Sequence, residues 1–173
     1  MEITELKAEL YDWVRPIVQR LPLFSGLSNT SYQVLIRSAD MVRLKGGETL
    51  IKQGVPADAF FILLKGKVSV YHERDNGDVV LLGEARAPVT LGEIGLLLEQ
   101  TRTATVIADD DIQAMRFRLP AFEALFDSLE GFGFHVAKTL AARVDDLSQR
   151  IRKGEPSHHT AADDALIDLM DLE

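Results

Sequence analysis

The chain has 173 residues, of which 46% are hydrophobic and 27% charged, with a net charge of −8 and no cysteine. This composition is typical of one globular domain, and the lack of cysteine excludes disulfides, thiolate metal ligands and cysteine nucleophiles. The acidic first residues differ from a signal peptide, and no apolar run approaches the ~18 residues of a membrane span, so we expect a cytoplasmic protein without membrane contact.

The first 38 residues are predicted to be mainly helical. Apolar residues at three- and four-residue spacing predict a helix over Thr4–Gln19, with a kink or an early end at Pro16. A turn-rich connection over Leu21–Ser28 leads to a short helix over Ser31–Ser38, which Ser28 or Thr30 is expected to cap.

Residues 39–118 contain short β-rich runs in place of a helical pattern. The predicted strands are Met41–Leu44, Thr49–Ile51, Ala59–Leu64, Lys67–His72, Val79–Glu84, Thr103–Ala108 and Ile112–Arg118. Asn76-Gly77, between two of them, is typical of a hairpin turn. Short strands with glycine-rich turns indicate a sandwich, a jelly roll or a barrel.

The most informative segment is Leu91–Val106, in which Glu93 and Arg102 lie nine residues apart. The Gly92-Glu93 turn opens one apolar helical turn, whose N–H groups and partial positive charge favour an anion. Arg102 supplies a planar fork for phosphate oxygens, whereas Glu93 would repel a bare phosphate and is suited to accept from a hydroxyl. Together they indicate a pocket for a ribose phosphate.

Residues 119–153 are predicted to form two helices. Pro120 begins one that ends near Ser128, and a longer one runs from about Phe134 to Lys153, after Gly131 and Gly133. An apolar stripe follows the long helix: Phe132, Val136, Leu140, Val144, Leu147 and Ile151. Its first half is expected to pack on the protein's own strands. Alternatively, the stripe is a seam for the same helix of a second subunit.

Residues 154–173 are predicted to form an acidic, flexible tail with six acidic residues and no lysine or arginine. The overall negative charge opposes nucleic-acid binding, and 20 residues are too few for a helix-turn-helix module, so we expect no nucleic-acid partner. Leu166, Leu169 and Met170 alternate with acids. A disordered tail, a lid over the pocket and a short helix in a partner's groove all remain open.

No catalytic residue is predicted. The sequence has neither a nucleophile-elbow nor a Walker pattern, and its four histidines do not show the spacing of a triad or a metal site. An acid paired with arginine is a poor proton donor at neutral pH. We therefore expect no enzyme activity, no metal and no cofactor.

The Gly92-Glu93 pair, the apolar turn, Arg102 and the strand that follows resemble the phosphate-binding cassette of the cyclic nucleotide-binding domain family. Gly47–Tyr71, with turns at Gly54 and Gly66, is similar to the family's opening strands. The resemblance covers about Leu21 to Lys153. It implies an α+β, mainly β fold, with an antiparallel β-roll (jelly roll) over 39–118, the cassette at 91–106, N-terminal helices and a long C-terminal helix.

The resemblance also implies roles for individual residues. Glu93 would accept from the ribose 2′-hydroxyl and Arg102 would bind the phosphate, while Gly92 and Gly95 let the backbone approach the ligand. Thr103 is compatible with cGMP as the ligand as well as with cAMP. A threonine that simply begins a strand is an equally good explanation of this residue. The other ligand-binding residues that we predict are Ile94, Leu96, Ala104, Val70 and Leu81, with Arg143, Leu147 and Ser148 of the long helix at the base.

The implied function is a non-catalytic sensor of cAMP or cGMP. Ligand binding would move the C-terminal helices and so change a homodimer contact or a contact with a protein partner. Two alternatives remain open at this point. One is a scaffold that works through its acidic tail and leaves the pocket unused, and the other is a sensor of a cyclic dinucleotide.

Overall fold

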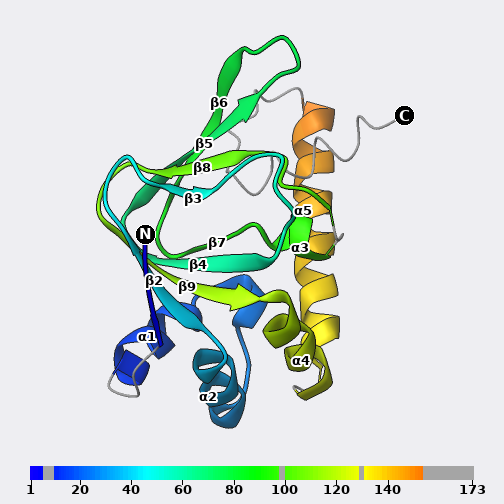
Figure 1. The fold of residues 1–173 in the computed structure, drawn as a ribbon. Coiled ribbons are helices and arrows are strands. Elements are labelled where there is room, and N and C mark those ends of the chain that lie inside the picture. The colour runs from blue at the N-terminus through cyan, green and yellow to red at the C-terminus, as the bar shows by residue number, and fades with distance from the viewer. Residues whose placement is uncertain (6–9, 98–99, 129–130, 154–173) are drawn as a thin grey trace.

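The computed structural model describes residues 1–5, 10–97, 100–128 and 131–153. In these residues the strands form two antiparallel sheets that face each other as a β-roll, with helices around it (Figure 1). The predicted α+β, mainly β fold is therefore confirmed. The five-stranded sheet has the order β1-β2-β9-β4-β7 and the four-stranded sheet the order β3-β8-β5-β6.

The strands are β1 (Glu2–Glu5), β2 (Asp40–Leu44), β3 (Thr49–Ile51), β4 (Ala59–Lys65), β5 (Lys67–Glu73), β6 (Val79–Arg86), β7 (Val89–Leu91), β8 (Thr105–Ala108) and β9 (Ile112–Arg118). The helices are α1 (Tyr11–Val18), the short 3-10 helix η2 (Pro22–Phe24), α2 (Asn29–Arg37), α3 (Glu93–Leu97), α4 (Leu119–Ser128) and α5 (Phe132–Lys153).

Two hydrophobic clusters lie on opposite faces of the five-stranded sheet. In β2, Val42 and Leu44 belong to the cluster between the two sheets, the roll cluster, whereas Met41 packs toward the helices. That second cluster, the helix-side cluster, includes the stacked rings of Phe60 and Phe117, with centroids 4.7 Å apart. Figure 1 shows α1, α2 and α4 on this side of the sheet.

The first half of the apolar stripe on α5 packs on the protein itself, as predicted. Phe132 and Val136 are buried in the helix-side cluster, and Leu140 packs against it. Val144, one turn further along α5, is exposed. Among the stripe residues whose side chains the structure describes, the inward-facing ones are therefore Phe132, Val136 and Leu140.

The predicted helix over Thr4–Gln19 is wrong at its N-terminal end. Residues Glu2–Glu5 form β1, which pairs antiparallel with β2, and the helix begins only at Tyr11. The edge of β2 offers backbone donors and acceptors that β1 satisfies, and this pairing overrides the helical periodicity of the sequence. Residues 6–9, and with them the predicted helical position of Leu6, lie outside the described residues.

Turn chemistry is predicted correctly at two points. Ser28 caps α2, because its side chain accepts a hydrogen bond from the Ser31 N–H at 3.1 Å. In the β5–β6 hairpin, Gly77 has φ +85°, and the Asn76 side chain accepts from the Asp78 N–H at 3.1 Å. The three-residue strand β7 is missed, because only its pairing with β4 defines it.

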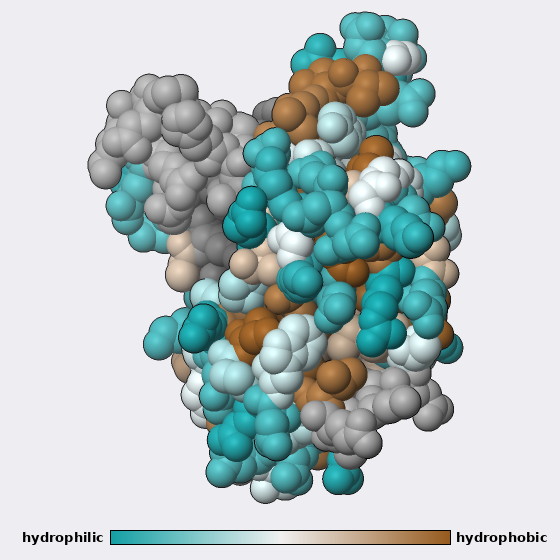
Figure 2. Space-filling model, turned by 90° about the vertical axis from the view of Figure 1, so that its left-hand side faces the viewer, coloured by the Kyte–Doolittle hydropathy of each residue, from teal (hydrophilic) through white to brown (hydrophobic). Residues whose placement is uncertain are grey.

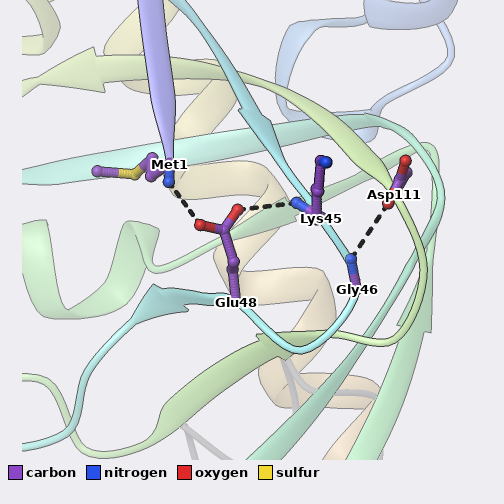
Figure 3. A network of polar contacts seen from close by, with 5 residues as sticks. All are labelled: Met1, Lys45, Gly46, Glu48 and Asp111. Carbon is purple, nitrogen blue, oxygen red and sulfur yellow. Dashed lines mark hydrogen bonds and ion pairs between the residues drawn. The ribbon is translucent and has the colours of Figure 1, made fainter.

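Polar contacts join the N-terminus to the loops at the end of the roll near Gly46 (Figure 3). The Gly46 N–H donates to Asp111 Oδ1 at 3.3 Å, and the Lys45 N–H donates to Glu48 Oε2 at 2.8 Å. The N-terminal ammonium of Met1 donates to Glu48 Oε1 at 2.7 Å, which anchors β1. This ammonium lowers the pKa of the Glu48 carboxyl below its ordinary value, and the Lys45 N–H acts in the same direction.

We predict that Glu48→Gln lowers the melting temperature near neutral pH and that this deficit shrinks in acid. A carboxyl with a depressed native pKa stabilises the fold above its unfolded pKa of about 4.3, and that contribution is lost as the pH falls through the native pKa. Thermal unfolding at about pH 7 and about pH 3 measures both effects. Glu123→Gln, at an exposed position on α4, is the control. An equal deficit at both pH values would contradict an ionic role for Glu48.

Candidate functional site

The cassette begins where β7 ends beside β4. Leu91, the last residue of β7, is the register partner of Phe61 near the start of β4. The chain then turns at Gly92, forms α3, and reaches Arg102 shortly before β8 begins at Thr105. Glu93 therefore directly follows the Gly92 turn, and Arg102 reaches the same turn from the other end of the cassette.

Arg102 is buried beneath the Gly92 turn, with 6% of its surface exposed. Its Nη1 donates to the carbonyl oxygen of Gly92 at 2.9 Å, and its Nη2 donates to the carbonyl oxygen of Ala59. The Asp58 carboxylate lies 3.7 Å from the same Nη2. The guanidinium therefore links the cassette turn to the first residue of β4.

Arg102 is the cation of the site, and the carboxylates of Asp58 and Glu93 act on it. Burial lowers the pKa of the Arg102 guanidinium, while the carboxylates of Asp58 and Glu93 act to raise it. Arginine nevertheless keeps its proton at neutral pH, so the site holds a permanent positive charge. The Asp58 side chain is 83% exposed. An anion that reaches Arg102 from solvent therefore competes with Asp58.

Glu93 is the first residue of α3 and is 2% exposed. The Thr90 hydroxyl lies 3.4 Å from its Oε1 and donates to it. Among the described residues, Glu93 and Arg102 are the only charged side chains that are buried. The structure therefore brings together, below the surface, the two residues that the sequence analysis had assigned to ribose and phosphate.

Both the backbone conformation at position 92 and the atoms close to it require glycine. Its φ is +78°, and a Cβ atom there would lie 2.7 Å from Arg102 Nη1 and 3.0 Å from Ile51 Cδ1. At Gly95 an added Cβ would meet Ala57 Cβ at 3.4 Å, an ordinary contact. Close approach of the backbone is thus essential at Gly92 and incidental at Gly95.

The structure places the other predicted ligand-binding residues of the roll and the cassette in different surroundings. Val70 is buried in the roll cluster, and Ala104 packs against it. Leu96 is buried in the helix-side cluster. Thr103 is exposed. The Ile94 side chain lies outside what the structure describes, so its predicted contact stays a prediction.

Leu81 points away from the roll interior. It is 51% exposed and pairs with Tyr71, whereas its neighbour Leu82 packs against the roll cluster. Because successive strand residues face opposite sides of a sheet, Leu82 is the residue of this pair that turns inward. Figure 2 shows a hydrophobic patch on the projecting β5–β6 hairpin, where Val79 and Leu81 are exposed.

The predicted base contacts on α5 are only partly described. The Ser148 hydroxyl donates to the Val144 carbonyl oxygen of its own helix at 2.8 Å. The side chains of Arg143 and Leu147 lie outside the described part of the structure, as does the whole of residues 154–173. Contacts of these side chains with a base, and the alternatives for the tail, stay predictions.

The sequence analysis missed Asp58 and Thr90. Asp58 directly precedes β4, and the pairing of β4 with β7 brings it to the cassette. Thr90 lies on β7, three residues before Glu93 in the chain. The Thr90-x-x-Glu93 spacing is that of a capping box and was a usable signal for Thr90. No short spacing relates Asp58 to Arg102, so the role of Asp58 follows only from the folded arrangement.

The described residues contain neither a membrane-spanning helix nor a metal-binding cluster. None of the helices there is both long enough and apolar enough to cross a membrane. The same residues hold no group of three or more histidine, aspartate or glutamate side chains placed to bind a metal ion.

We predict that Gly92→Ala destabilises the protein by at least about 1–2 kcal/mol, the cost of a left-handed backbone for a residue with a Cβ. The added methyl group also displaces the Arg102 guanidinium. Gly95→Ala is the matched control, because alanine favours a helix over glycine by roughly 0.5–1 kcal/mol. Denaturant unfolding compares the two variants. A Gly92→Ala protein as stable as Gly95→Ala would refute this account of the turn.

Comparison with known proteins agrees with the geometry. The family model for the cyclic nucleotide-binding domain matches residues 41–128. Lysophospholipase nte1 of Emericella nidulans is 30% identical over 121 residues, which cover 69% of this chain and 8% of that protein. Its counterpart in Aspergillus niger is 31% identical over 108 residues, 62% of this chain and 7% of that protein. The chain therefore spans less than a tenth of the length of these relatives.

Solved structures share the fold. The sensor domain of the transcriptional regulator DNR from Pseudomonas aeruginosa has a TM-score of 0.70 and 25% identity, covering 88% of this chain and 99% of that one. The regulatory domain of Toxoplasma gondii PKA with cAMP has a TM-score of 0.65 and 19% identity, covering 70% of this chain and 46% of that one. The family model matches more than half of the chain, including most of the roll and the whole cassette. This chain belongs to the cyclic nucleotide-binding domain family.

Proposed function

We propose that the chain is a non-catalytic sensor that binds cAMP or cGMP at the Glu93–Arg102 site. One observation carries this proposal: these two residues are the only buried charged side chains in the described part of the structure. Two buried charges cost desolvation energy and are weak evidence for a purely structural role. A ligand that uses both charges explains their position.

A ribose cyclic phosphate suits the chemistry of the site. The Arg102 guanidinium carries the positive charge that a phosphate requires. Its fork has five N–H donors, and two of the groups that carry them, Nη1 and Nη2, also bond to the carbonyl oxygens of Gly92 and Ala59. The Glu93 carboxylate accepts hydrogen bonds and therefore suits the ribose 2′-hydroxyl. Low exposure strengthens both interactions relative to water.

The two nucleotides differ only in the base, and the described residues do not select between them. Thr103 is exposed next to Arg102, where its hydroxyl is available to a guanine amino group. On β6, Leu82 takes the place of Leu81 as the proposed ligand-binding residue, because Leu82 packs against the roll cluster. Arg143, Leu147 and Ser148 stay the proposed base contacts from α5.

We infer a regulatory role from the relatives. The named lysophospholipases are more than ten times as long as the matched segment, so the similarity concerns one small part of each. This chain contains no nucleophile-elbow pattern of its own. The proposal is therefore that it controls an activity located elsewhere, on a partner or on another part of a longer protein.

A second face of α5 supports a contact with another copy of the chain. Phe134, Ala137, Ala141 and Val144 are exposed and recur at intervals of three, four and three residues. This is the spacing of a coiled-coil seam, and its central alanines let two helices approach closely. We infer that ligand binding, by favouring one position of α5, changes a homodimer contact at this seam.

We predict that a cyclic nucleotide raises the melting temperature and that linear AMP does not. A ligand at about a hundredfold over its dissociation constant adds ~2.7 kcal/mol, or roughly 5–10 °C for a domain of this size. Arg102→Lys, which keeps the charge and loses the fork, and Glu93→Gln should each weaken binding by about tenfold or more. Arg43→Ala, exposed on β2, is the control.

Three other outcomes of these binding measurements would contradict parts of the proposal. A shift only with cyclic dinucleotides would identify a different ligand. No shift with any nucleotide would contradict the sensor and leave the scaffold alternative. Unchanged affinity in both variants would remove the assigned roles of Glu93 and Arg102.

We predict that Ala141→Arg abolishes self-association and that Ala142→Arg does not. Both alanines are exposed on α5, but only Ala141 lies on the seam. Sedimentation velocity with and without cAMP measures the oligomeric state of each variant. A wild-type protein that stays monomeric under both conditions, or a dimer that survives Ala141→Arg, would rule out this contact.

A further inference from the structure

Gln53 makes an unusual pair of hydrogen bonds with one residue of a distant strand. Its side-chain Nε2 donates to the Glu73 carbonyl oxygen at 2.7 Å, and its Oε1 accepts from the Glu73 N–H at 2.8 Å. A side-chain amide thus satisfies both backbone groups of Glu73, as a neighbouring strand would. The Gln53 N–H also donates to Thr105 Oγ1 at 3.1 Å. This residue therefore joins the end of β5 to the start of β8.

The two residues after Gln53 hold the backbone of Arg102. The Gly54 N–H donates to the Arg102 carbonyl oxygen at 2.8 Å, and the Arg102 N–H donates to the Val55 carbonyl oxygen at 2.8 Å. Both backbone groups of the arginine are therefore bonded to a segment that Gln53 fastens. The position of the guanidinium depends on this short loop.

A second side chain of β5 supports the same segment. His72 Nδ1 lies 2.8 Å from the Thr103 carbonyl oxygen. A carbonyl oxygen only accepts, so Nδ1 carries the proton in this contact. The regular pairing of β5 with β8 ends at Tyr71 and Thr105. Beyond that point, the contacts of Gln53 and His72 continue the connection with side chains.

We propose that Gln53, supported by His72, is the positioning residue for Arg102 in anion binding. This inference rests on the proposed function, since it concerns the affinity of the same site. Gln53 does not touch the guanidinium. It fixes the loop that holds the arginine backbone on both sides, and it ties that loop to the β5–β6 hairpin. A change in the hairpin is thereby transmitted to the phosphate-binding group.

The side-chain amide of glutamine suits the paired hydrogen bonds to Glu73 better than the side chains of glutamate or asparagine do. Glutamate has the same length but offers no donor to the Glu73 carbonyl oxygen, and it places a negative charge there. Asparagine is one methylene shorter. Gln53→Glu therefore removes one bond of the pair at nearly constant volume, and Gln53→Ala removes both.

The test is the dissociation constant for cAMP and for cGMP, measured at a temperature where every variant is folded. Both Gln53 variants should weaken both nucleotides by about tenfold, equivalent to about 1.4 kcal/mol. The factor should be the same for each nucleotide, because the two share the phosphate. Lys52→Ala, an exposed neighbour, should bind like the wild type. Wild-type affinity in Gln53→Ala would overturn the proposal.

A stability control separates positioning from general weakening of the fold. Tyr32→Phe loses the buried hydrogen bond to the Phe24 carbonyl oxygen, at 2.6 Å, in the helix-side cluster. It should lower the melting temperature and leave both dissociation constants unchanged. Equal losses of affinity in Tyr32→Phe and Gln53→Ala would show that Gln53 acts only through stability.

Hydrogen exchange at the Arg102 amide gives a readout that needs no ligand. Exchange should be faster in Gln53→Ala than in the wild type and unchanged in Lys52→Ala, because the side-chain bonds of Gln53 help to fasten the loop that accepts this N–H. If the wild type binds neither nucleotide, the proposed function fails while this measurement still decides the positioning. Unchanged exchange in Gln53→Ala would overturn it.

Discussion

The burial of Arg102 between two backbone carbonyl oxygens is the constraint on which the site depends. Because its side chain reaches under the turn to Gly92 and across to Ala59, the turn must pass close above it. That closeness excludes a Cβ atom at Gly92, whose φ of +78° already favours glycine. The same packing buries Glu93 at the start of α3 and leaves Asp58 as the exposed partner of the guanidinium.

Strand β4 connects this site with the rest of the molecule. Ala59, Phe61 and Leu63 belong to the roll cluster, while Phe60 and Ile62 belong to the helix-side cluster. The carbonyl oxygen of Ala59 accepts from Arg102, and the ring of Phe60 packs against Phe122 of α4 at 4.9 Å. A shift of the cassette at the start of β4 thus has a continuous packed route to the C-terminal helices. Close-packed interiors transmit such shifts because they hold few voids.

The helix α5 has two apolar faces with different tasks. One face, with Phe132 and Val136, closes the helix-side cluster, and the other, with Phe134 and Val144, is exposed. A helix that is both a wall of the core and a free surface is suited to report a change inside the domain to a second molecule. This arrangement fits a regulatory module, and it is consistent with relatives in which the matched segment is a small part of a longer protein.

Local patterns in the sequence determined the strands other than β1 and β7, the hairpin at Asn76-Gly77, the cap at Ser28 and the cassette, because each depends on residues close together in the chain. Glu93 and Arg102 could be singled out for the same reason. Pairing between distant segments decided the rest. It made β1 a strand, turned Leu82 inward in place of Leu81, brought Asp58 to the cassette, and set Gln53 against Glu73. Short-range spacing carries no record of these contacts, since the partners are far apart in the sequence and meet only in the folded chain.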